Sequence, residues 1–324
     1  MSEFSFREAV RQALDDELAE DQRVIFLGQD IGVYGGAFGV SRGLFDKYGE
    51  ERIIETPISE NSVVGVAVGA AMAGYKPVVE IMFQDFVTLA MDQIVNHAAK
   101  IAYIYDGQLN APITLRLASG GGRGYGASHS QTLDSWFMHV PGLKVVAPSM
   151  PDDAYTLLRS AIQDPSPVIF IEHKLAYDVK GERPDRYEPK PLRNGRIVTP
   201  GTDVTIITYG HMVHVSRVAA SVMAEQGVDV EIIDLRVLKP LDQDLITTSV
   251  KKTGKAVIVE EGCKIAGVGA EVAGIILEQC LEYLDGRVLR VGAEDTPIPS
   301  AGHLEKVVLP DVARIVDSLS RVFI

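Results

Sequence analysis

A glycine-rich stretch that ends in a histidine is the first part of the chain whose residue types could do chemistry. Residues 119–131 read SGGGRGYGASHSQ, with five glycines and one arginine ahead of His129. Glycine-rich loops with a basic residue often bind phosphate, but this one lacks the GxxxxGK[ST] pattern and a ribose-binding acid at the expected distance. The stretch therefore favours a flexible active-site loop that delivers His129, because catalytic side chains are commonly carried on such loops.

Glu60 is the second residue whose position suggests a chemical role. It stands in ETPISENSVVGVAVGAAMAG, residues 55–74, at the entry to a predicted helix of small residues that we expect to be buried. One explanation is that the helix dipole favours a carboxylate near a helix N-terminus. The alternative is that the apolar surroundings suit this carboxylate for proton transfer. Position alone leaves both explanations open.

Other side chains narrow the range of chemistry. Phe83 and Phe86 stand at the entry of another predicted helix, where an aromatic ring serves either the core or a cofactor. The chain has no HExxH and no paired metal-binding histidines, and its GVSRG at 39–43 lies in a glycine-rich stretch without the strand-turn-helix pattern of a nucleophile elbow, so a serine hydrolase or a zinc enzyme is a poor interpretation. Cys263 and Cys280 match no metal or disulfide spacing, and we expect them to be buried thiols.

The elements that must position these residues alternate between strand and helix. A capping box, Ser5 and Glu8, starts the first helix. This alternation is typical of a parallel sheet with helices on its faces, and such sheets bind ligands beyond the carboxyl ends of their strands. Strands are predicted at 24–27, 78–82, 113–117, 143–147, 168–171, 204–208, 230–233, 256–259 and 288–291, and helices at about 61–73, 87–103 and 151–162.

Length and composition indicate two domains. A chain of 324 residues is long enough for two domains of ordinary size. The alternating pattern breaks between about 177 and 201, where four prolines stand among mixed charges. We therefore expect a first domain at 1–180, a linker at 181–200 and a second domain at 201–324.

Charge and hydropathy exclude several partners. The net charge of −13 disfavours non-specific binding to nucleic acid or to an anionic membrane. No apolar run reaches the roughly 20 residues that span a bilayer. The N-terminal residues MSEFSFREAV lack the layout of a signal peptide, so we expect a cytoplasmic location.

Several stretches, in order along nearly the whole chain, together carry a family resemblance. They are LGQDIGVYGGAFGVSRGL, ETPISENSVVGVAVGAAMAG, MDQIVNHAAK, GASHSQT, VPGLKVVAPSMPDDAYTLLRSAIQDPSPVIF and IDLRVLKPLD. The chain resembles the beta subunit of the thiamine-diphosphate-dependent decarboxylating component of 2-oxo-acid dehydrogenase complexes. That resemblance implies an α/β fold, with a parallel-sheet pyrimidine-binding domain followed by a transketolase-like C-terminal domain.

The resemblance also implies partners and a reaction. The family forms alpha-2-beta-2 heterotetramers with active sites at the alpha–beta interfaces, so this chain would be active only with an alpha subunit. The enzyme would oxidatively decarboxylate a 2-oxo acid on thiamine diphosphate. The acyl group would then pass to a lipoyl domain of a dihydrolipoyl acyltransferase core.

Individual roles follow from the same resemblance. Glu60 matches the glutamate that hydrogen-bonds a ring nitrogen of the aminopyrimidine and favours the imino tautomer, whose nitrogen deprotonates the thiazolium carbon. Phe86 matches the aromatic ring that stacks on the aminopyrimidine, and Ile58 belongs to the same cofactor-binding set. His129 matches the histidine that contacts the substrate-derived intermediate and assists transfer to the lipoyl group.

The resemblance assigns metal ions as well. Thiamine diphosphate enzymes hold magnesium through a Gly-Asp-Gly motif with a later asparagine, whereas this chain has only YDG at 105–107. In this family that motif belongs to the alpha subunit, which would hold the magnesium. Some members carry a structural potassium ion bound mainly by backbone carbonyls; the matching positions here are Ile113, Ala161, Ile162, Asp164 and Ser166.

The substrate and two other functions stay open. We expect a pyruvate dehydrogenase-type enzyme, but YDGQ at 105–108 and GGGRGYGAS depart from the usual pattern, so acetoin and branched-chain 2-oxo acids remain alternatives. A single-chain transketolase-like enzyme is disfavoured by the missing magnesium motif. A non-catalytic scaffold subunit is disfavoured by the presence of Glu60, Phe86 and His129.

Overall fold

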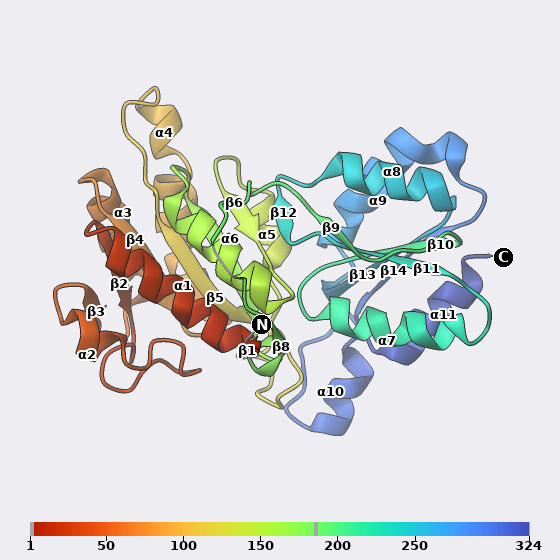
Figure 1. The fold of residues 1–324 in the computed structure, drawn as a ribbon, viewed down its shortest axis with the longest axis horizontal. Coiled ribbons are helices and arrows are strands. Elements are labelled where there is room, and N and C mark those ends of the chain that lie inside the picture. Colours follow the sequence, from red (N-terminus) through yellow and green to blue (C-terminus); the bar gives the residue numbers. More distant parts are fainter. Residues whose placement is uncertain (1–2, 185–186, 324) are drawn as a thin grey trace. The chain divides into compact units, whose positions relative to one another are not determined.

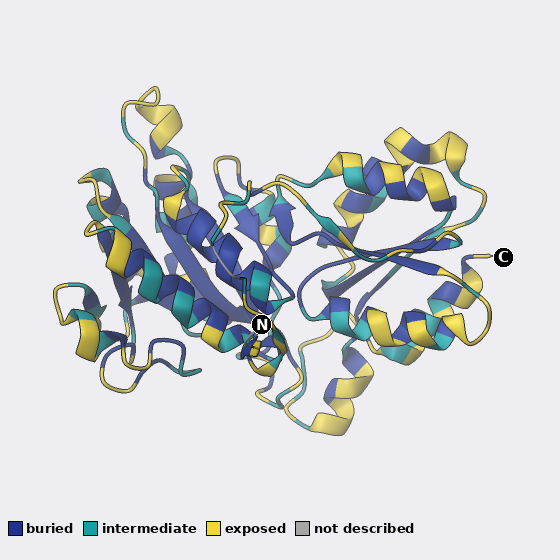
Figure 2. Ribbon diagram, in the orientation of Figure 1, coloured by how far each residue is buried: buried dark blue, intermediate teal, exposed yellow. Residues whose placement is uncertain are grey.

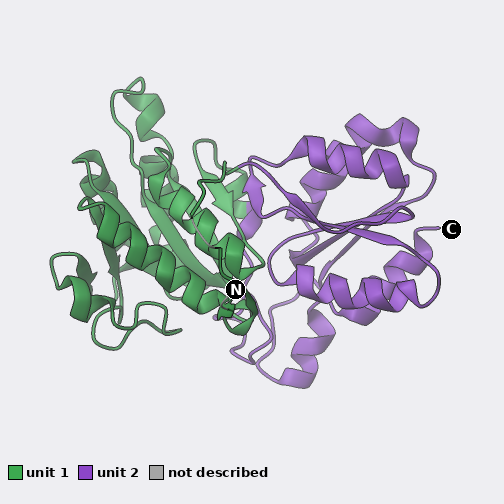
Figure 3. Cartoon of the chain, viewed as in Figure 1, with its two compact units in different colours: residues 1–119, 136–192 green, residues 120–135, 193–324 purple. Residues whose placement is uncertain are grey.

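A computed structural model describes residues 3–184 and 187–323 of the chain. The chain divides into two compact units, drawn in different colours in Figure 3. Unit 1 comprises residues 1–119 and 136–192, and unit 2 comprises residues 120–135 and 193–324. The segment 120–135, which carries the glycine-rich loop, therefore belongs to unit 2. Residues 185–186, which fall within the linker expected at 181–200, lie outside the described residues.

A parallel sheet forms the centre of unit 1 (Figure 1). Its strands are almost wholly buried (Figure 2), because helices cover a parallel sheet, and this explains their near-continuous apolar sequences. In spatial order they are β6 (Lys144–Val146), β7 (Val168–His173), β5 (Thr114–Ser119), β4 (Lys76–Ile81), β2 (Val24–Gly28) and β3 (Ile53–Glu55).

Helices α1 (Phe6–Glu20) and α6 (Pro151–Gln163) lie side by side in unit 1. The predicted capping box at the start of α1 is confirmed, since the Ser5 hydroxyl accepts from the Glu8 amide and the Glu8 carboxylate accepts from the Ser5 amide. Unit 1 also contains β1 (Glu3–Ser5), α2 (Leu44–Tyr48), α3 (Glu60–Met72), η3 (Ala176–Asp178) and β8 (Lys180–Glu182). The short helix α5 (Asp134–Met138) begins in the segment 120–135 and ends in unit 1.

The single helix predicted at about 87–103 is wrong in detail. The segment instead forms a 3-10 helix, η1 (Gln84–Ala90), a π-helical turn, η2 (Gln93–Ala98), and a short helix, α4 (Ile101–Ile104). Hydrophobic spacing reports which side chains face the core. It does not show whether each amide bonds three, four or five residues back, and here the Ala99 amide bonds Ile94.

Helix α3 is buried on one side only. Its buried side includes Val64, Ala67 and Val68, whereas Val66 and Gly69 on the other side are exposed. The helix that we expected to be buried is therefore buried on this side and exposed on the other within this chain. A helix that is apolar on every side commonly has its second side covered by another element or another chain.

Unit 2 is a second α/β layer structure. Its sheet has the order β14 (Val288–Ala293), β13 (Ala256–Cys263), β10 (Val204–Thr208), β11 (Val230–Asp234) and β9 (Arg196–Thr199). The strands pair in parallel except for β9, which runs antiparallel to β11. Beyond the sheet, unit 2 has β12 (Val237–Lys239), η4 (Leu281–Tyr283) and α10 (Gly302–Val308).

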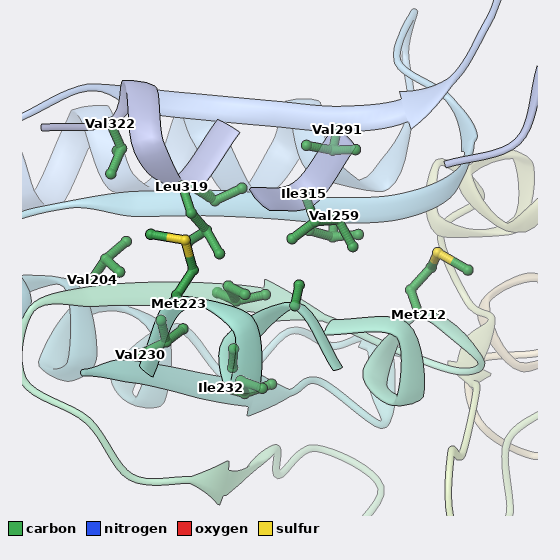
Figure 4. Packing of buried hydrophobic residues seen from close by; sticks show 14 residues of the cluster. Val204, Met212, Met223, Val230, Ile232, Val259, Val291, Ile315, Leu319 and Val322 are labelled. Carbon is green, nitrogen blue, oxygen red and sulfur yellow. The ribbon is translucent and has the colours of Figure 1, made fainter. Parts of the chain in front are cut away.

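Two pairs of helices cover the sheet of unit 2. Helices α7 (Met212–Ala224) and α11 (Val312–Arg321) cover one face, and α8 (Gln243–Thr253) and α9 (Val268–Cys280) cover the other (Figure 1). Under α7 and α11, Met223, Ile232 and Leu319 belong to one cluster of buried apolar side chains (Figure 4). Burial of this kind contributes about 1.5–3 kcal/mol for each large aliphatic side chain.

Candidate functional site

Glu60 is the first residue of α3, and only 7% of it is exposed. Its carboxylate forms no hydrogen bond or ion pair with any other residue in the described ranges. A carboxylate that other side chains leave unpaired, in a residue that is otherwise buried, is suited to a ligand that supplies a hydrogen-bond donor. The dipole explanation alone accounts for the position at a helix N-terminus but does not account for the burial.

Phe86 lies on η1, and η1 packs against α3 within unit 1. Phe86 is partly exposed and contacts the edge of Phe83 at a centroid distance of 6.0 Å. Phe83 in turn contacts Phe38 edge-on, and Phe38 stacks on Tyr177 at 5.2 Å. The buried Lys174 places its ammonium 5.1 Å from the centre of the Phe83 ring. Phe86 is therefore a partly exposed member of an aromatic row.

Ile58 precedes Glu60 by two residues and is 81% exposed. A large aliphatic side chain with this exposure offers apolar surface to a ligand or to another chain. The structure thus brings together the elements that carry Glu60, Phe86 and Ile58, all in unit 1.

Within the sheet of unit 1, the three neighbouring strands β4, β5 and β7 carry a buried charge network. Arg116 bonds Glu172 through two nitrogens, each at 2.7 Å, and bonds Glu80 at 2.5 Å. The Tyr177 hydroxyl donates to Glu172 at 2.8 Å. Burial raises the pKa of Glu80, although Arg116 opposes the shift, and burial raises the pKa of Tyr177 well above its usual value.

Our prediction of the site missed this network. Its signal lies in the strand sequences VVEI, TLRLAS and VIFIEH, each of which places a charged residue inside or at the end of an apolar run. Opposite charges in neighbouring buried strands indicate an ion network, because an isolated buried charge is too costly.

His129 lies on the glycine-rich loop, which belongs to unit 2. The Gly120 amide donates to the Gln131 carbonyl at 3.3 Å and closes the loop at its base. The His129 amide donates to the Gly126 carbonyl at 3.2 Å, and Ser128 Oγ lies 2.9 Å from His129 Nδ1. The imidazole is partly exposed, so a ligand can reach it.

The glycine loop binds anionic groups, but those groups come from unit 2 itself. The Gly121 amide donates to Glu261 at 2.7 Å. The amides of Gly122 and Gly124 donate to Glu305 at 2.8 and 3.0 Å. Glu261 and Glu305 are also residues that our sequence prediction missed. The available signal was the run of glycine amides, which needs acceptors once it is packed.

Next to Glu261, a cavity of about 450 Å³ opens in unit 2. Two residues of the cavity lining bond each other, since the Thr132 hydroxyl donates to the Glu261 carboxylate at 3.3 Å. The lining combines apolar side chains such as Leu133 and Ile298 with Glu261 and Asp295.

Glu260, the residue before Glu261, is a buried carboxylate of β13. Burial raises its pKa to about 7, and a hydrogen bond from Arg290 at 3.1 Å opposes the shift. The Gly269 amide also donates to this carboxylate at 3.1 Å. Glu260 therefore titrates close to neutral pH within unit 2.

The cysteine, histidine and acidic side chains decide whether the chain itself could hold a metal ion. Both thiols are free, and Cys280 is buried as expected, whereas Cys263 is partly exposed because it ends β13. Within residues 3–184 and 187–323, no group of three or more His, Cys, Asp or Glu side chains could hold a metal ion. No helix of those ranges is long and apolar enough to cross a membrane.

Most of the positions matched to potassium lie where α6 leads into β7, and Ile113 lies directly before β5. The Ile113 carbonyl accepts from Val168 at 2.9 Å, and the Ala161 carbonyl accepts from Asp164 at 3.2 Å. A carbonyl oxygen has a second lone pair, so these hydrogen bonds leave capacity for a cation. The Asp164 carboxylate already pairs with Lys144 at 2.5 Å.

Comparisons with known proteins define the class first. A family model described as "Transketolase, pyrimidine binding domain" matches residues 2–180, and one described as "Transketolase, C-terminal domain" matches residues 193–315. A solved structure titled "Split gene transketolase, inactive beta4 tetramer" covers 99% of this chain and 98% of its own, with a TM-score of 0.80 and 24% identity. The chain is therefore a transketolase-like two-domain α/β protein, which confirms the predicted fold class.

Sequence relatives narrow the class. The "Pyruvate dehydrogenase E1 component subunit beta" of Rickettsia felis is 42% identical over 320 residues, which cover 99% of this chain and 98% of the relative. The protein of the same name from Staurastrum punctulatum is 42% identical, with the same two coverages. The "Pyruvate dehydrogenase E1 component subunit beta-2, mitochondrial" of Oryza sativa subsp. japonica is 42% identical, covering 98% of this chain and 86% of the relative.

The chain belongs to the family of E1-component beta subunits, the decarboxylase component of 2-oxo-acid dehydrogenase complexes. This confirms the resemblance inferred from the sequence. The pair of transketolase domains also places the chain in a thiamine-diphosphate-dependent enzyme family.

Proposed function

We propose that this chain supplies one half of the active site of a pyruvate dehydrogenase-type decarboxylase, and that it works only with an alpha subunit. The observation that carries the proposal is the Glu60 carboxylate, which is nearly buried at the start of α3 and has no partner among the described residues. Acetoin and branched-chain 2-oxo acids are the alternative substrates.

Thiamine diphosphate fits the residues of unit 1. Its aminopyrimidine ring offers the nitrogen that a buried carboxylate can bond, and Phe86 offers a partly exposed aromatic face next to α3. When bound, the cofactor supplies the electron sink for decarboxylation. In our proposal Glu60 holds a proton at the aminopyrimidine, Phe86 stacks on it and Ile58 covers it from solvent.

His129 has a separate role in the proposal. Its imidazole contacts the substrate-derived acyl group and assists transfer to a lipoyl domain. The 2.9 Å contact with Ser128 Oγ supports this role, because a hydrogen bond at Nδ1 restricts the ring and selects its tautomer.

Exposed apolar surface in unit 1 supports an obligate partner. The exposed face of α3 includes Val66, and the segment around α4 exposes Tyr103 by 89% and Ile104 by 63%. Large apolar side chains exposed in groups are typical of interaction sites. We propose that an alpha subunit covers part of this surface in an alpha-2-beta-2 heterotetramer, that this alpha subunit holds the magnesium, and that the complex docks on a dihydrolipoyl acyltransferase core.

A structural potassium ion at Ile113, Ala161, Ile162 and Asp164 is a further part of the proposal. The support is the carbonyl oxygens at the end of α6, since carbonyls are ligands that hard cations accept. Potassium should raise the melting temperature of the chain above that in sodium at equal ionic strength. A cytoplasmic location also stays a prediction.

The experiment that tests the proposed function is reconstitution. The chain is co-expressed with the alpha subunit encoded in the same genome, and decarboxylation of pyruvate and branched-chain 2-oxo acids and cleavage of acetoin are measured with thiamine diphosphate and magnesium. We expect turnover of pyruvate by the complex and none by the chain alone. Absence of turnover with all the substrates, in a complex shown to assemble, would favour the scaffold alternative.

A further inference from the structure

The glycine loop is held in one conformation by two buried carboxylates of unit 2. Glu261 lies on β13 with 6% exposure, and Glu305 lies on α10 with 4% exposure. Glu305 uses both of its carboxylate oxygens, Oε1 for the Gly122 amide and Oε2 for the Gly124 amide. Glu261 accepts the Gly121 amide with its Oε1.

The backbone of the loop is shaped for these bonds. Glycines 120, 122, 124 and 126 all have positive φ, at +89°, +87°, +70° and +79°. Left-handed residues that alternate along a chain turn successive amides toward one side and form an anion-binding concavity. Glycine is needed here because other residues rarely adopt these angles. The glycines thus fix the direction of the amides in addition to any flexibility that they confer.

The carboxylates and the amides satisfy each other. Glu305 forms no ion pair with any described residue, so the loop amides are what stabilises its buried charge. Charge-assisted hydrogen bonds of this kind are about twice as strong as neutral ones. The loop also packs closely on Ser300. A Cβ atom added at Gly124 would lie only 3.1 Å from the carbonyl oxygen of Ser300, which leaves little room for a larger residue at this position.

We infer that Glu261 and Glu305 are positioning residues for acyl transfer, acting through the glycine loop on His129. The inference rests on the proposed function for the role of His129. Glu305 and His129 are connected by a short stretch of backbone. The last loop amide that Glu305 accepts is that of Gly124, and the turn that carries His129 starts two residues later, at Gly126. The two carboxylates bond backbone amides of the loop. We therefore expect them to act on His129 by fixing the position of its imidazole.

Substitution of Glu305 by glutamine gives a sharp test. A glutamine keeps the size of the side chain, but its amide nitrogen must face one of the two loop amides, donor against donor. Glu305→Asp keeps the charge and shortens the reach, so it should retain more of the function than the glutamine. Glu231→Gln is the matched control, because Glu231 is a fully buried carboxylate of the same unit whose partners are Ser249 and Lys252.

The experiment uses the full chain assembled with its alpha subunit. Hydrogen exchange of the amides at residues 121–124 and the rate of His129 modification by diethyl pyrocarbonate report on the loop without turnover. Two activities are then compared: decarboxylation coupled to an artificial electron acceptor, and acyl transfer to a lipoyl domain. Glu305→Gln should speed the exchange by about ten-fold or more, change the His129 modification rate and lower acyl transfer by about ten-fold or more, with decarboxylation nearly unchanged.

Each outcome decides the inference. Equal losses of both activities, or no change in exchange, would overturn it, as would the same loss in Glu231→Gln at equal folded content. If the unsubstituted complex decarboxylates no 2-oxo acid, the proposed function fails. The exchange and modification rates then still decide whether the two carboxylates hold the loop and place His129.

Discussion

Arg116 donates two parallel hydrogen bonds to Glu172, from Nε to Oε1 and from Nη2 to Oε2, each at 2.7 Å. The third guanidinium nitrogen, Nη1, donates to Glu80. A single guanidinium therefore joins carboxylates from β4 and β7, the strands on either side of β5. All three side chains are at least nine-tenths buried. The network therefore links three neighbouring strands, β4, β5 and β7, in unit 1.

Removal of the guanidinium should destabilise unit 1. In Arg116→Met two buried carboxylates lose their shared cation, and the loss of one partner from a buried ion pair costs about 3–5 kcal/mol. Chemical denaturation of the chain measures the change. Arg321→Ala is the control, because the pair between Arg321 and Asp317 is more than half exposed and should contribute less than about 0.5 kcal/mol. A cost below about 1 kcal/mol for Arg116→Met would contradict the prediction.

Glu260 should make the stability of unit 2 depend on pH. Burial raises its pKa from 4.5 to about 7, so the folded state binds a proton that the unfolded state releases. The stabilisation is fully present below about pH 4.5, falls as the pH rises toward 7, and is lost above that value. The total change is up to about 3 kcal/mol.

The check is denaturation at several pH values for the chain and for Glu260→Gln. The glutamine cannot ionise, so the decline between pH 4.5 and 7 should be smaller in the variant. Arg290 faces Glu260 at 3.1 Å and Asp134 adds a repulsive charge, and neither is altered by the substitution. Identical pH profiles for the two proteins would remove Glu260 as the cause.

Local patterns in the sequence predicted most of the fold. The alternation of apolar strands and amphipathic helices placed β2, β4, β5, β7 and the central strands of unit 2 within a few residues. The short strands β3 and β9 were not predicted, because three or four residues carry too little periodicity to be distinguished from loops. The membership of residues 120–135 in unit 2 depends on bonds such as Gly121 to Glu261, which join residues far apart in the chain.

The candidate site was less accessible from the sequence. Glu60 and His129 stand out by position, and the resemblance to a family assigned them roles. The carboxylates that hold the glycine loop did not stand out, because a glutamate such as Glu305 in the helix GHLEKVV is typical of an exposed position. Only the folded chain shows that this carboxylate is buried against glycine amides.

Glu60→Gln should lower turnover of the reconstituted complex by about 10²–10⁴-fold, the usual contribution of a group that positions a proton. Assembly with the alpha subunit should persist, because the substitution is isosteric and Glu60 bonds no described side chain. Steady-state decarboxylation together with gel filtration measures both properties. Glu51→Gln is the control, because it makes the same chemical change at an exposed residue of unit 1. Retained turnover in Glu60→Gln would remove Glu60 from the mechanism.

Phe86→Ala should weaken binding of thiamine diphosphate to the complex. Loss of a stacked ring costs about 0.5–1.5 kcal/mol beyond the lost apolar area, so the Kd should rise by about ten-fold or more. Calorimetric titration of the cofactor-free complex measures the change. Leu89→Ala is the control on η1, because Leu89 is 60% exposed. Equal affinities for the variant and the unsubstituted complex would exclude stacking on Phe86.

A double-mutant cycle separates an effect of Glu305 through His129 from an independent one. His129→Ala alone should lower acyl transfer to the lipoyl domain by about 10²–10⁴-fold while decarboxylation with an artificial acceptor continues. If Glu305 acts by placing the imidazole, Glu305→Gln should have little further effect once His129 is alanine, because residues that act as a unit are not additive. Single-turnover measurement of acyl transfer for the four proteins gives the coupling. Strict additivity would mean that the carboxylate acts on transfer without His129.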